Sequence, residues 1–432
     1  MMQEPNAYSR RLFLQQGLTL ASTLGTVPLF VERSAHGVAN PLGSALSSRP
    51  GVPEDRILVV VQLGGGNDGL NTVVPYFDDH YHRARPRIGM KAPGTPQAGN
   101  RQALQLDEDL GLGLHPQLGG LKSLYDEGQL AIIQGVGYPN PNRSHFTSMD
   151  IWQTGQTDGK GNGWLGRYFD HNCSGSPDPQ AAVTIGRNAP LALIGDKQKP
   201  VTFESEKLFR WTGQDLHQTL DAPYEKIVRR GTSEDVAPDS QLGYLLRTSL
   251  DAQVSSDQIR TAVQKKSLAS YGNHSLARQL KLIGAMIRGE LSTRVYYASL
   301  GGFDTHGNQL GSHAARLREV STALKSFQAD LAAQGNADRV VTMVFSEFGR
   351  RVAENGSTGT DHGTAAPMFL MGSQVQAGIW GNHPSLTNLD AGDLRYEIDF
   401  RSIYAGILKD WMKTDPSIIL NGDFRPAKVV KT

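Results

Sequence analysis

Residues 339–372 read RVVTMVFSEFGRRVAENGSTGTDHGTAAPMFLMG and contain the strongest strand-and-loop pattern of the chain. The apolar run at residues 340–345 is rich in β-branched side chains, and its length and composition are typical of a buried strand. A loop rich in Gly, Ser and Asn follows, and a second apolar run begins at residue 368. Buried strands joined by polar loops favour an α/β fold.

Acid and imidazole side chains stand at the ends of these two runs. Glu347 follows the first run directly, and Asp361 and His362 come shortly before the second. Ligands of open α/β sheets bind beyond the carboxyl ends of the strands. These three residues therefore predict one half of a metal-assisted hydrolytic site, and we expect the other half from earlier in the chain.

A second group of the same kind follows the predicted strand at residues 293–300. The sequence GGFDTHGNQ, residues 301–309, places Asp304 and His306 two positions apart. Their side chains project to the same side if the backbone stays extended. A carboxylate and an imidazole that converge after a strand suit a Zn, Mn or Mg/Ca-type site. In the alternative interpretation, Asp304 caps a turn and His306 is incidental.

The predicted first core strand, residues 57–63, leads into the glycine-rich sequence GGGNDG, residues 64–69. Glycines let the backbone turn sharply and approach a ligand. Asn67 and Asp68 are therefore candidates to reach a metal or an anion, or else they cap a tight turn. The spacing does not match the glycine pattern of dinucleotide-binding proteins. An extended segment is expected at residues 71–76.

The predicted strand at residues 130–136 is followed by YPNPNRSHFTSM, residues 138–149. Hydroxyls, a guanidinium (Arg143) and an imidazole (His145) gather there, as in hydrolases that place a nucleophile or an anion clamp after a strand. A helix is expected from about Ser144 to residue 153. Ser144 is then either the nucleophile or the N-cap of this helix, and the two roles are compatible because a helix N-terminus stabilises anions.

The composition excludes several other classes of protein. The 432 residues include 43 Lys and Arg against 42 Asp and Glu, a balance that gives no sign of a nucleic-acid partner. The 48 glycines fit a loop-rich enzyme better than a helical bundle. The single cysteine, Cys173, excludes an intramolecular disulfide, and we interpret it as an incidental free thiol.

The remaining periodic segments predict a single α/β domain over residues 55–432. Its sheet is expected to be mixed and mainly parallel, with helices on both faces and a cap or insertion at about residues 156–290. Helices are expected at residues 117–127, 241–265, 275–288, 312–334 and 402–412, and short strands at residues 182–186 and 191–195.

The N-terminus carries an export signal of the twin-arginine type. Arg10 and Arg11 precede Leu-Phe-Leu, a moderately apolar segment and then small residues. We predict a signal peptide at residues 1–39 and a linker at residues 40–54. The twin-arginine translocon would be a partner during export, and the mature protein would be periplasmic or secreted, with no stable membrane span.

Several of these stretches together resemble the bacterial family called domain of unknown function 1501 (DUF1501). The resemblance rests on the twin-arginine start and on QLGGGNDGLNTVVPY, SHFTSMDIWQTG, GGFDTHGNQ, FSEFGRR and GTDHGTAAP, and it covers nearly the whole mature chain. That family is usually placed near the alkaline phosphatase and sulfatase superfamily, whose members hydrolyse phosphate or sulfate esters at one- or two-metal sites. The resemblance thus implies an alkaline phosphatase-like fold.

The superfamily pattern transfers only in part. Its nucleophile opens a helix after the second segment, which makes Ser144 the best match, with Thr147 and Ser148 behind it. Its last His ligand precedes a strand, as His362 does. Alternatively, Asp361 and His362 match the Asp-His pair that follows its later strand, displaced here by a loop. Its first strand ends in a metal-binding Asp, whereas the matching place here is glycine-rich and Asp68 lies a few residues late.

The sequence therefore predicts an exported, metal-dependent hydrolase of phosphate or sulfate esters that acts on a small-molecule or glycan ester. Two alternatives are a non-catalytic exported binding or assembly protein with a degenerate site, and a hydrolase of other carbohydrate or lipid esters. The nucleophile would be Ser144 or a water, with Arg143 or Arg350 offsetting substrate charge and His145 as a further catalytic candidate. The candidate ligands of one or two Zn, Mn, Ca or Mg ions are Asp68, Asp304, His306, Glu347, Asp361 and His362.

Overall fold

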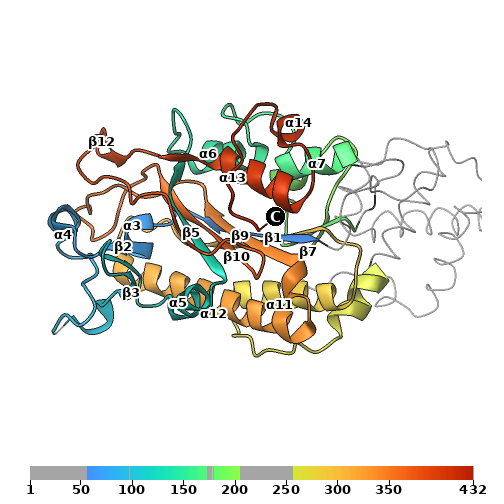
Figure 1. Ribbon diagram of the computed structural model, residues 1–432, viewed down its shortest axis with the longest axis horizontal. Helices are drawn as coiled ribbons and strands as arrows, with labels where there is room; N and C mark the ends of the chain where they lie inside the picture. The colour runs from blue at the N-terminus through green and yellow to red at the C-terminus, as the bar shows by residue number, and fades with distance from the viewer. Residues whose placement is uncertain (1–55, 97, 173–177, 179, 205–255, 432) are drawn as a thin grey trace, which may run out of the picture.

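The computed structural model describes residues 56–96, 98–172, 178, 180–204 and 256–431 (Figure 1). One large sheet runs through the middle, with one group of helices above it and another below it in the view of Figure 1. The expected signal peptide, the expected linker and Cys173 lie outside the described residues. In the part of the chain that is described, no helix is long and apolar enough to cross a membrane.

Among the described residues the large sheet has nine strands in the order β11-β5-β10-β9-β1-β8-β6-β7, with β14 also paired to β5. All neighbours pair in parallel except β10, which is antiparallel to both β5 and β9. The predicted mixed, mainly parallel sheet is confirmed. Its strands are β1 (Ile57–Gly64), β5 (Leu130–Gly137), β6 (Ala182–Ile185), β7 (Val201–Phe203), β8 (Val295–Gly301), β9 (Val340–Ser346), β10 (Ala366–Met371), β11 (Gly378–Trp380) and β14 (Ile398–Asp399).

The central strand β1 is buried on both faces of the sheet. Val59 and Val61 pack in the hydrophobic core on one face, and Leu58 and Val60 pack in the core on the other. Successive side chains of a strand point to opposite faces, and a parallel strand covered on both faces is apolar throughout. This double burial explains the continuous apolar run at residues 57–61.

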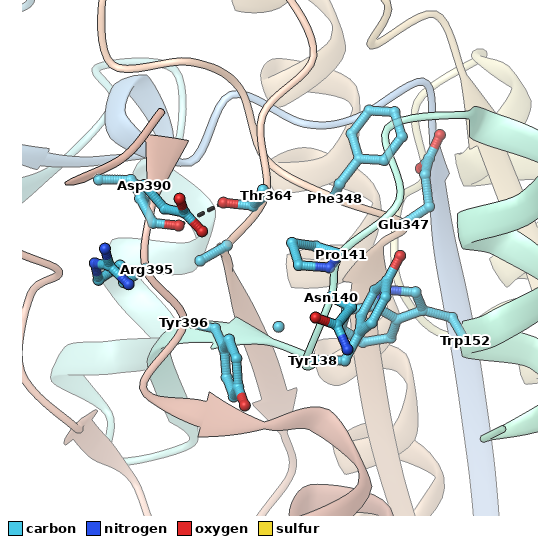
Figure 2. A pocket seen from close by; sticks show the side chains of 13 residues that line it. Tyr138, Asn140, Pro141, Trp152, Glu347, Phe348, Thr364, Asp390, Arg395 and Tyr396 are labelled. Carbon is cyan, nitrogen blue, oxygen red and sulfur yellow. Dashed lines mark hydrogen bonds between the residues drawn. The ribbon is translucent and has the colours of Figure 1, made fainter. Parts of the chain in front are cut away.

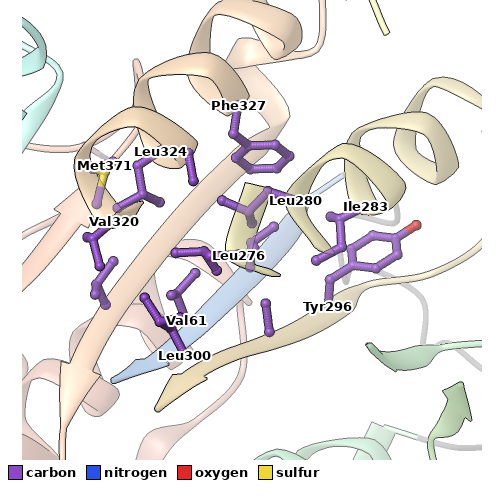
Figure 3. Close-up of a cluster of buried hydrophobic side chains, with 14 of the residues drawn as sticks. Val61, Leu276, Leu280, Ile283, Tyr296, Leu300, Val320, Leu324, Phe327 and Met371 are labelled. Atoms are coloured by element: carbon purple, nitrogen blue, oxygen red, sulfur yellow. The ribbon is translucent and has the colours of Figure 1, made fainter. Parts of the chain in front are cut away.

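Helices cover both faces, as the sequence predicted. On the lower face in Figure 1, Leu280 and Phe327 come from two long helices and pack over Val61 (Figure 3). The helices of this face are α5 (Gly119–Asp126), α11 (Ser275–Arg288) and α12 (Gln309–Gln334). The opposite face is covered by α6 (His145–Thr154), α7 (Trp164–Asn172), α13 (Phe400–Gly406), a π-helical segment (Ile407–Trp411) and α14 (Pro416–Leu420).

Two small sheets and short helices lie outside the large sheet, and some differ from expectation. Residues 71–76, expected to be extended, begin inside the helical turn of residues 69–72, and only residues 73–75 form a strand. The strand expected at residues 191–195 is a 3₁₀ turn (Leu191–Leu193), and β7 was not expected. The additional elements are α3 (Gly69–Thr72), β2 (Val73–Pro75), α4 (Asp79–Ala84), β3 (Leu104–Asp107), β4 (Leu112–Leu114), β12 (Leu389–Asp390) and β13 (Asp393–Leu394).

The segment expected to form an insertion contributes to the body of the domain. β6 pairs in parallel with β8 and with β7, so both strands extend the large sheet. α11 packs on the sheet, and residues 256–263 are helical. The helix expected at residues 241–265 otherwise lies outside the described residues, as does the stretch 205–255.

The topology brings the predicted site residues to one edge of the sheet. β1, β5, β8 and β9 run in the same direction, so the segments that follow them lie at the same edge. β10 runs the opposite way, which places the residues that precede it at this edge too. The loops after β8 and β9 and the loop before β10 therefore meet, as a ligand site at the carboxyl ends of parallel strands requires.

Candidate metal centre

Three imidazoles converge on the carboxylate of Asp304, which follows β8. His306 Nε2 lies 3.0 Å and His362 Nε2 lies 3.2 Å from Asp304 Oδ1. His145 Nε2, from the first residue of α6, lies 3.6 Å from Asp304 Oδ2. The Nε2 atoms of His306 and His362 are 2.9 Å apart. Four side chains from three separate segments thus point their polar atoms at one small volume.

The opposite nitrogen of each ring is held by an oxygen acceptor. His145 Nδ1 lies 2.7 Å from Glu347 Oε1, and His306 Nδ1 lies 3.0 Å from Asp361 Oδ1. His362 Nδ1 lies 2.9 Å from the backbone carbonyl oxygen of Arg143. A carboxylate or carbonyl oxygen only accepts, so each Nδ1 atom donates to it, and the Nε2 atom is the one turned toward Asp304. This is the arrangement of metal-bound histidines, whose second nitrogen donates to a carboxylate or carbonyl.

The distances fit a cation held by three of these residues. Ligand atoms about 2.0–2.1 Å from a tetrahedral zinc lie about 3.3 Å from one another, and one ligand atom each from His145, Asp304 and His362 lie within 4.8 Å of one another. His306 Nε2 lies 3.0 Å from Asp304 Oδ1 and 2.9 Å from His362 Nε2 and does not belong to that set of three. The buried Nε2 atom of His145 has no hydrogen-bond partner among the described residues. Imidazole nitrogens and a carboxylate oxygen are ligands of divalent ions such as zinc, so the side chains present fit a divalent metal ion.

Glu347, which the sequence marked as a candidate ligand, contacts the Nδ1 side of His145. Its Oε1 atom accepts hydrogen bonds from the backbone N–H of Gly65 at 2.8 Å and from His145, and its Oε2 atom lies 3.0 Å from the Ser346 hydroxyl. The residue is 2% exposed. Ser148 is also engaged, because its hydroxyl donates to the backbone carbonyl of Glu347 at 2.6 Å. Glu347 therefore orients His145, as Asp361 orients His306.

The buried guanidinium of Arg350 holds the Asp304 carboxylate in place. The Arg350 side chain donates to Asp304 Oδ1 at 2.7 Å and to backbone carbonyls that include those of Gly66 at 2.7 Å and Thr360 at 2.9 Å. Burial raises the pKa of Asp304, but the hydrogen bond and charge of Arg350, with His362 and His306, outweigh it and lower that pKa to about 2. Asp304 is thus ionised across the physiological range, while burial lowers the pKa of His362 and favours its neutral, ligating form.

The glycine-rich turn after β1 allows this close packing. Gly65 has φ +116, which L side chains rarely adopt, and a Cβ atom there would lie 2.5 Å from the backbone nitrogen of Asp304. Its N–H donates to Glu347 and its carbonyl accepts from Arg350. Glycine is therefore required at this position by both backbone conformation and space.

Asp68 does not join the group around Asp304. Its side chain is fully buried and forms an ion pair with Arg85 at 2.6 Å. Burial raises the pKa of Asp68, but the charge and hydrogen bond of Arg85, with further help from His313 and Gln309, keep it lowered. His313, whose Nε2 lies 2.9 Å from Asn67 Oδ1, belongs to the same buried network. Asp68 thus holds the loop after β1 in place.

The α6 terminus presents the remaining sequence candidates to solvent. Ser144 is the N-cap residue, its side chain makes no capping hydrogen bond, and it is exposed, as is Thr147. Arg143 pairs with the buried carboxylate of Asp393. Sequence reasoning named His145 as a catalytic candidate and did not foresee its place beside Asp304, nor the roles of Arg85 and Asp393. The imidazole directly after the predicted N-cap was the available signal for His145.

The sequence matches the model of a family described as "Protein of unknown function (DUF1501)" over residues 55–408, which confirms the resemblance seen in the motifs. No curated protein matches the sequence.

Similar solved structures include the C-terminal periplasmic domain of EcEptC from Escherichia coli in complex with Zn, at 8% identity and a TM-score of 0.36, with 77% of each chain covered. The lipoteichoic acid synthase LtaP from Listeria monocytogenes follows at 10% identity and a TM-score of 0.32, with 82% of this chain and 73% of that chain covered. The alkaline phosphatase of the Antarctic bacterium TAB5 has 10% identity and a TM-score of 0.29, with 77% of this chain and 95% of that chain covered. At these identities the similarity concerns the fold alone.

Proposed function

The chain belongs to the DUF1501 family, and we propose that it is an exported hydrolase of phosphate or sulfate esters that works with one divalent metal ion. One observation carries the proposal: three imidazoles turn their Nε2 atoms to Asp304 while an oxygen acceptor holds each Nδ1 atom. His145, Asp304, His306 and His362 would hold the ion. When bound, such an ion acts as a Lewis acid on an ester oxygen and lowers the pKa of a bound hydroxyl or water.

The side chains around these four support one ion rather than two. Both oxygens of Glu347 already have partners, and Asp361 Oδ1 accepts from His306 and from the Asn355 amide at 3.1 Å. Asp68 is paired with Arg85. Arg350 supplies a permanent positive charge beside Asp304, where a further cation would be repelled.

Ser144 is the best placed hydroxyl of this chain for nucleophilic attack. It lies between Arg143, whose carbonyl orients His362, and His145 itself. The N-terminus of α6 favours an anion at this place through its backbone N–H groups and dipole. Arg143 is 41% exposed and keeps N–H groups available for ester oxygens, whereas Arg350 is buried and acts through Asp304.

Export is part of the proposal because Arg10 and Arg11 open a signal of the twin-arginine type. The mature chain would then work in the periplasm or outside the cell. Replacing both arginines with lysine should leave full-length protein in the cytoplasm, as measured by cell fractionation and by the mass of the N-terminus. Processed protein outside the cytoplasm in that variant would contradict the assignment of this route.

Hydrolysis of p-nitrophenyl phosphate and p-nitrophenyl sulfate tests the activity. We expect turnover by the wild type and losses of at least about 100-fold in His306→Ala and in His362→Ala. His274→Ala is the matched control, because His274 caps α11 and lies outside the centre. If the Ser144 hydroxyl is the nucleophile, Ser144→Ala should abolish turnover. Unchanged turnover in this variant would indicate that a water molecule attacks the ester.

The second candidate function is an exported binding or assembly protein with an inactive hydrolase site. It is favoured by one observation: the loop after β1 gives no carboxylate to the centre, since Asp68 faces Arg85. Stoichiometric metal in a protein that turns over none of a broad panel of phosphate and sulfate esters would support this alternative over the hydrolase.

A further inference from the structure

A cavity of about 310 Å³ lies next to the metal centre, at the end of β5 (Figure 2). Glu347 and Phe348 form the wall that the cavity shares with the centre. The Phe348 ring lies 4.9 Å from the His145 ring and 5.1 Å from the His362 ring, measured between centroids. A group held in the cavity would therefore sit beside the centre without occupying it. The volume lies at the lower end of the range of small-molecule sites.

The lining combines aromatic faces with polar groups that lack partners. Tyr138, Trp152, Phe348 and Tyr396 supply aromatic surface, and Figure 2 shows the side chains of Tyr138 and Tyr396 on two sides of the space. Trp152 is 2% exposed, and its indole N–H has no hydrogen-bond partner among the described residues. The indole nitrogen itself has almost no accessible area, so it lies within the wall and does not contact a group in the cavity.

The polar lining offers both donors and acceptors of hydrogen bonds. Arg395 donates to the backbone carbonyl of Leu389 at 3.3 Å and keeps further N–H groups unused. The side chains of Asn140, Asp390 and Tyr396 are exposed to solvent, and within the part of the chain that is described they make no hydrogen bond, so their polar groups are open to a ligand. Donors and acceptors thus surround a space that also has aromatic walls.

This mixture selects among the chemical classes of ligand. An anion would be repelled by the carboxylates of Asp390 and Glu347, and a cation would be repelled by Arg395. A purely apolar group would take water from the Asp390 carboxylate and the Asn140 amide without replacing its hydrogen bonds. A neutral ring that carries several hydroxyls satisfies both needs, because each hydroxyl donates and accepts and the ring's C–H surface packs on aromatic faces.

We propose that this cavity binds a neutral sugar unit, and that this sugar carries the phosphate or sulfate ester presented to the metal centre. The first half stands on the cavity alone, and the second half rests on the proposed function. Neither half requires a change in the protein's fold, since the cavity is preformed between β5, the loop after β9 and the segment of β12 and β13.

Gly137 keeps the cavity wall in place and provides a selective perturbation. A Cβ atom at this position would lie 2.6 Å from the Tyr396 Cβ atom, so Gly137→Ala must displace Tyr396. Gly137 is the last residue of β5 and lies outside the group of His145, Asp304, His306 and His362. Gly137→Ala should therefore weaken sugar binding and leave metal content unchanged.

Saturation-transfer NMR with the mature chain tests the first half, using methyl glycosides of glucose, galactose, mannose and N-acetylglucosamine as probes. We expect at least one glycoside to bind, with a dissociation constant at least about tenfold higher in Arg395→Ala and Tyr396→Ala. Arg278→Ala is the matched control, because Arg278 lies on an exposed face of α11 and donates only to the backbone and side-chain oxygens of Asn273 among the described residues. Binding should persist in the double variant His306→Ala/His362→Ala.

Absence of binding by every glycoside, or binding unchanged in both Arg395→Ala and Tyr396→Ala, would overturn the sugar site. Stronger binding of methyl glucuronide than of methyl glucoside would also overturn it, since the carboxylates should repel an anion. The second half is tested with sugar phosphates and sulfates against ethyl phosphate: Tyr396→Ala should raise KM about tenfold for the sugar esters only, with kcat changed less than about twofold. Sugar binding without hydrolysis of any sugar ester would leave the cavity assignment standing and refute the ester assignment.

Discussion

The replacement Glu347→Gln should weaken zinc binding without unfolding the protein. Glu347 Oε1 accepts from the Gly65 N–H and from the His145 Nδ1–H, so the glutamine oxygen must take that place. The amide nitrogen then faces the Ser346 hydroxyl, which accepts a hydrogen bond, and His145 keeps its tautomer. What is lost is the negative charge that makes the imidazole a better ligand. Losses of this kind raise the dissociation constant for metal by about 10- to 100-fold, or about 1.4–2.7 kcal/mol.

We expect Glu347→Gln near the lower end of this range and Glu347→Ala near the upper end, because alanine leaves both N–H donors without an acceptor. The assay is competition for zinc against a chelating dye, with thermal unfolding to verify the fold. Glu319→Gln is the matched control, since Glu319 Oε2 lies 3.8 Å from the Nδ1 atom of His274, far from the centre. A dissociation constant within about twofold of wild type in folded Glu347→Ala would refute the assigned role of Glu347.

Three further predictions address the fold around the centre. Gly65→Ala should lower the free energy of unfolding by about 1–3 kcal/mol or more and abolish metal binding. Gly65 has φ +116, and a Cβ atom there would lie 2.5 Å from the backbone nitrogen of Asp304. The control is Gly128→Ala, because Gly128 has φ +69 but open space around it. This variant should lower the free energy of unfolding by about 1 kcal/mol in denaturant titration and keep its metal. Equal losses of stability in the two variants would contradict the role of close packing at Gly65. Asp68→Asn should lower the free energy of unfolding by about 3–5 kcal/mol by leaving the Arg85 charge buried and unpaired, with metal per folded chain unchanged. Burial lowers the pKa of His313 to about 4 from an ordinary 6.5, so between these values the unfolded chain binds the extra proton. His313 should then contribute a fall of about 3 kcal/mol in the free energy of unfolding as pH drops from 6.5 to 4, beside the contributions of His115 and His383, whose pKa values burial also lowers. His313→Gln should reduce this slope by that amount in denaturant titrations at several pH values.

The sequence predicted those features that depend on local pattern. The apolar, β-branched run of β9 indicated a buried strand, and the acid and imidazole directly after such runs indicated the edge where ligands bind. The position of His362 before a strand also predicted that it lies at this edge, because an antiparallel strand begins at the edge where its parallel neighbours end. Asp304, His306 and His362 are side by side for this reason.

The sequence could not separate the proposed metal ligands from the side chains that hydrogen-bond to them. Glu347 and Asp361 have the same chemistry as Asp304, and only the three-dimensional hydrogen bonds assign them to His145 and His306. Asp68 stands in a typical ligand position after β1, but its partner Arg85 comes from the segment after α4, a contact that no local pattern indicates. The sequence also did not indicate that part of the segment expected as a cap, residues 156–290, would extend the large sheet: β6 and β7 are short, β6 pairs with β8, and β7 pairs with β6.

Elemental mass spectrometry of protein purified without a metal-affinity tag tests the central claim most directly. The measurement compares the wild type with His306→Ala/His362→Ala, and the control variant is His274→Ala. We predict close to one Zn, Mn, Ca or Mg ion per wild-type chain and per control chain, and loss of that ion from the double variant with the fold retained. Absence of bound metal from a folded wild type, or equal metal in the folded double variant, would contradict the assignment of these histidines to a metal centre.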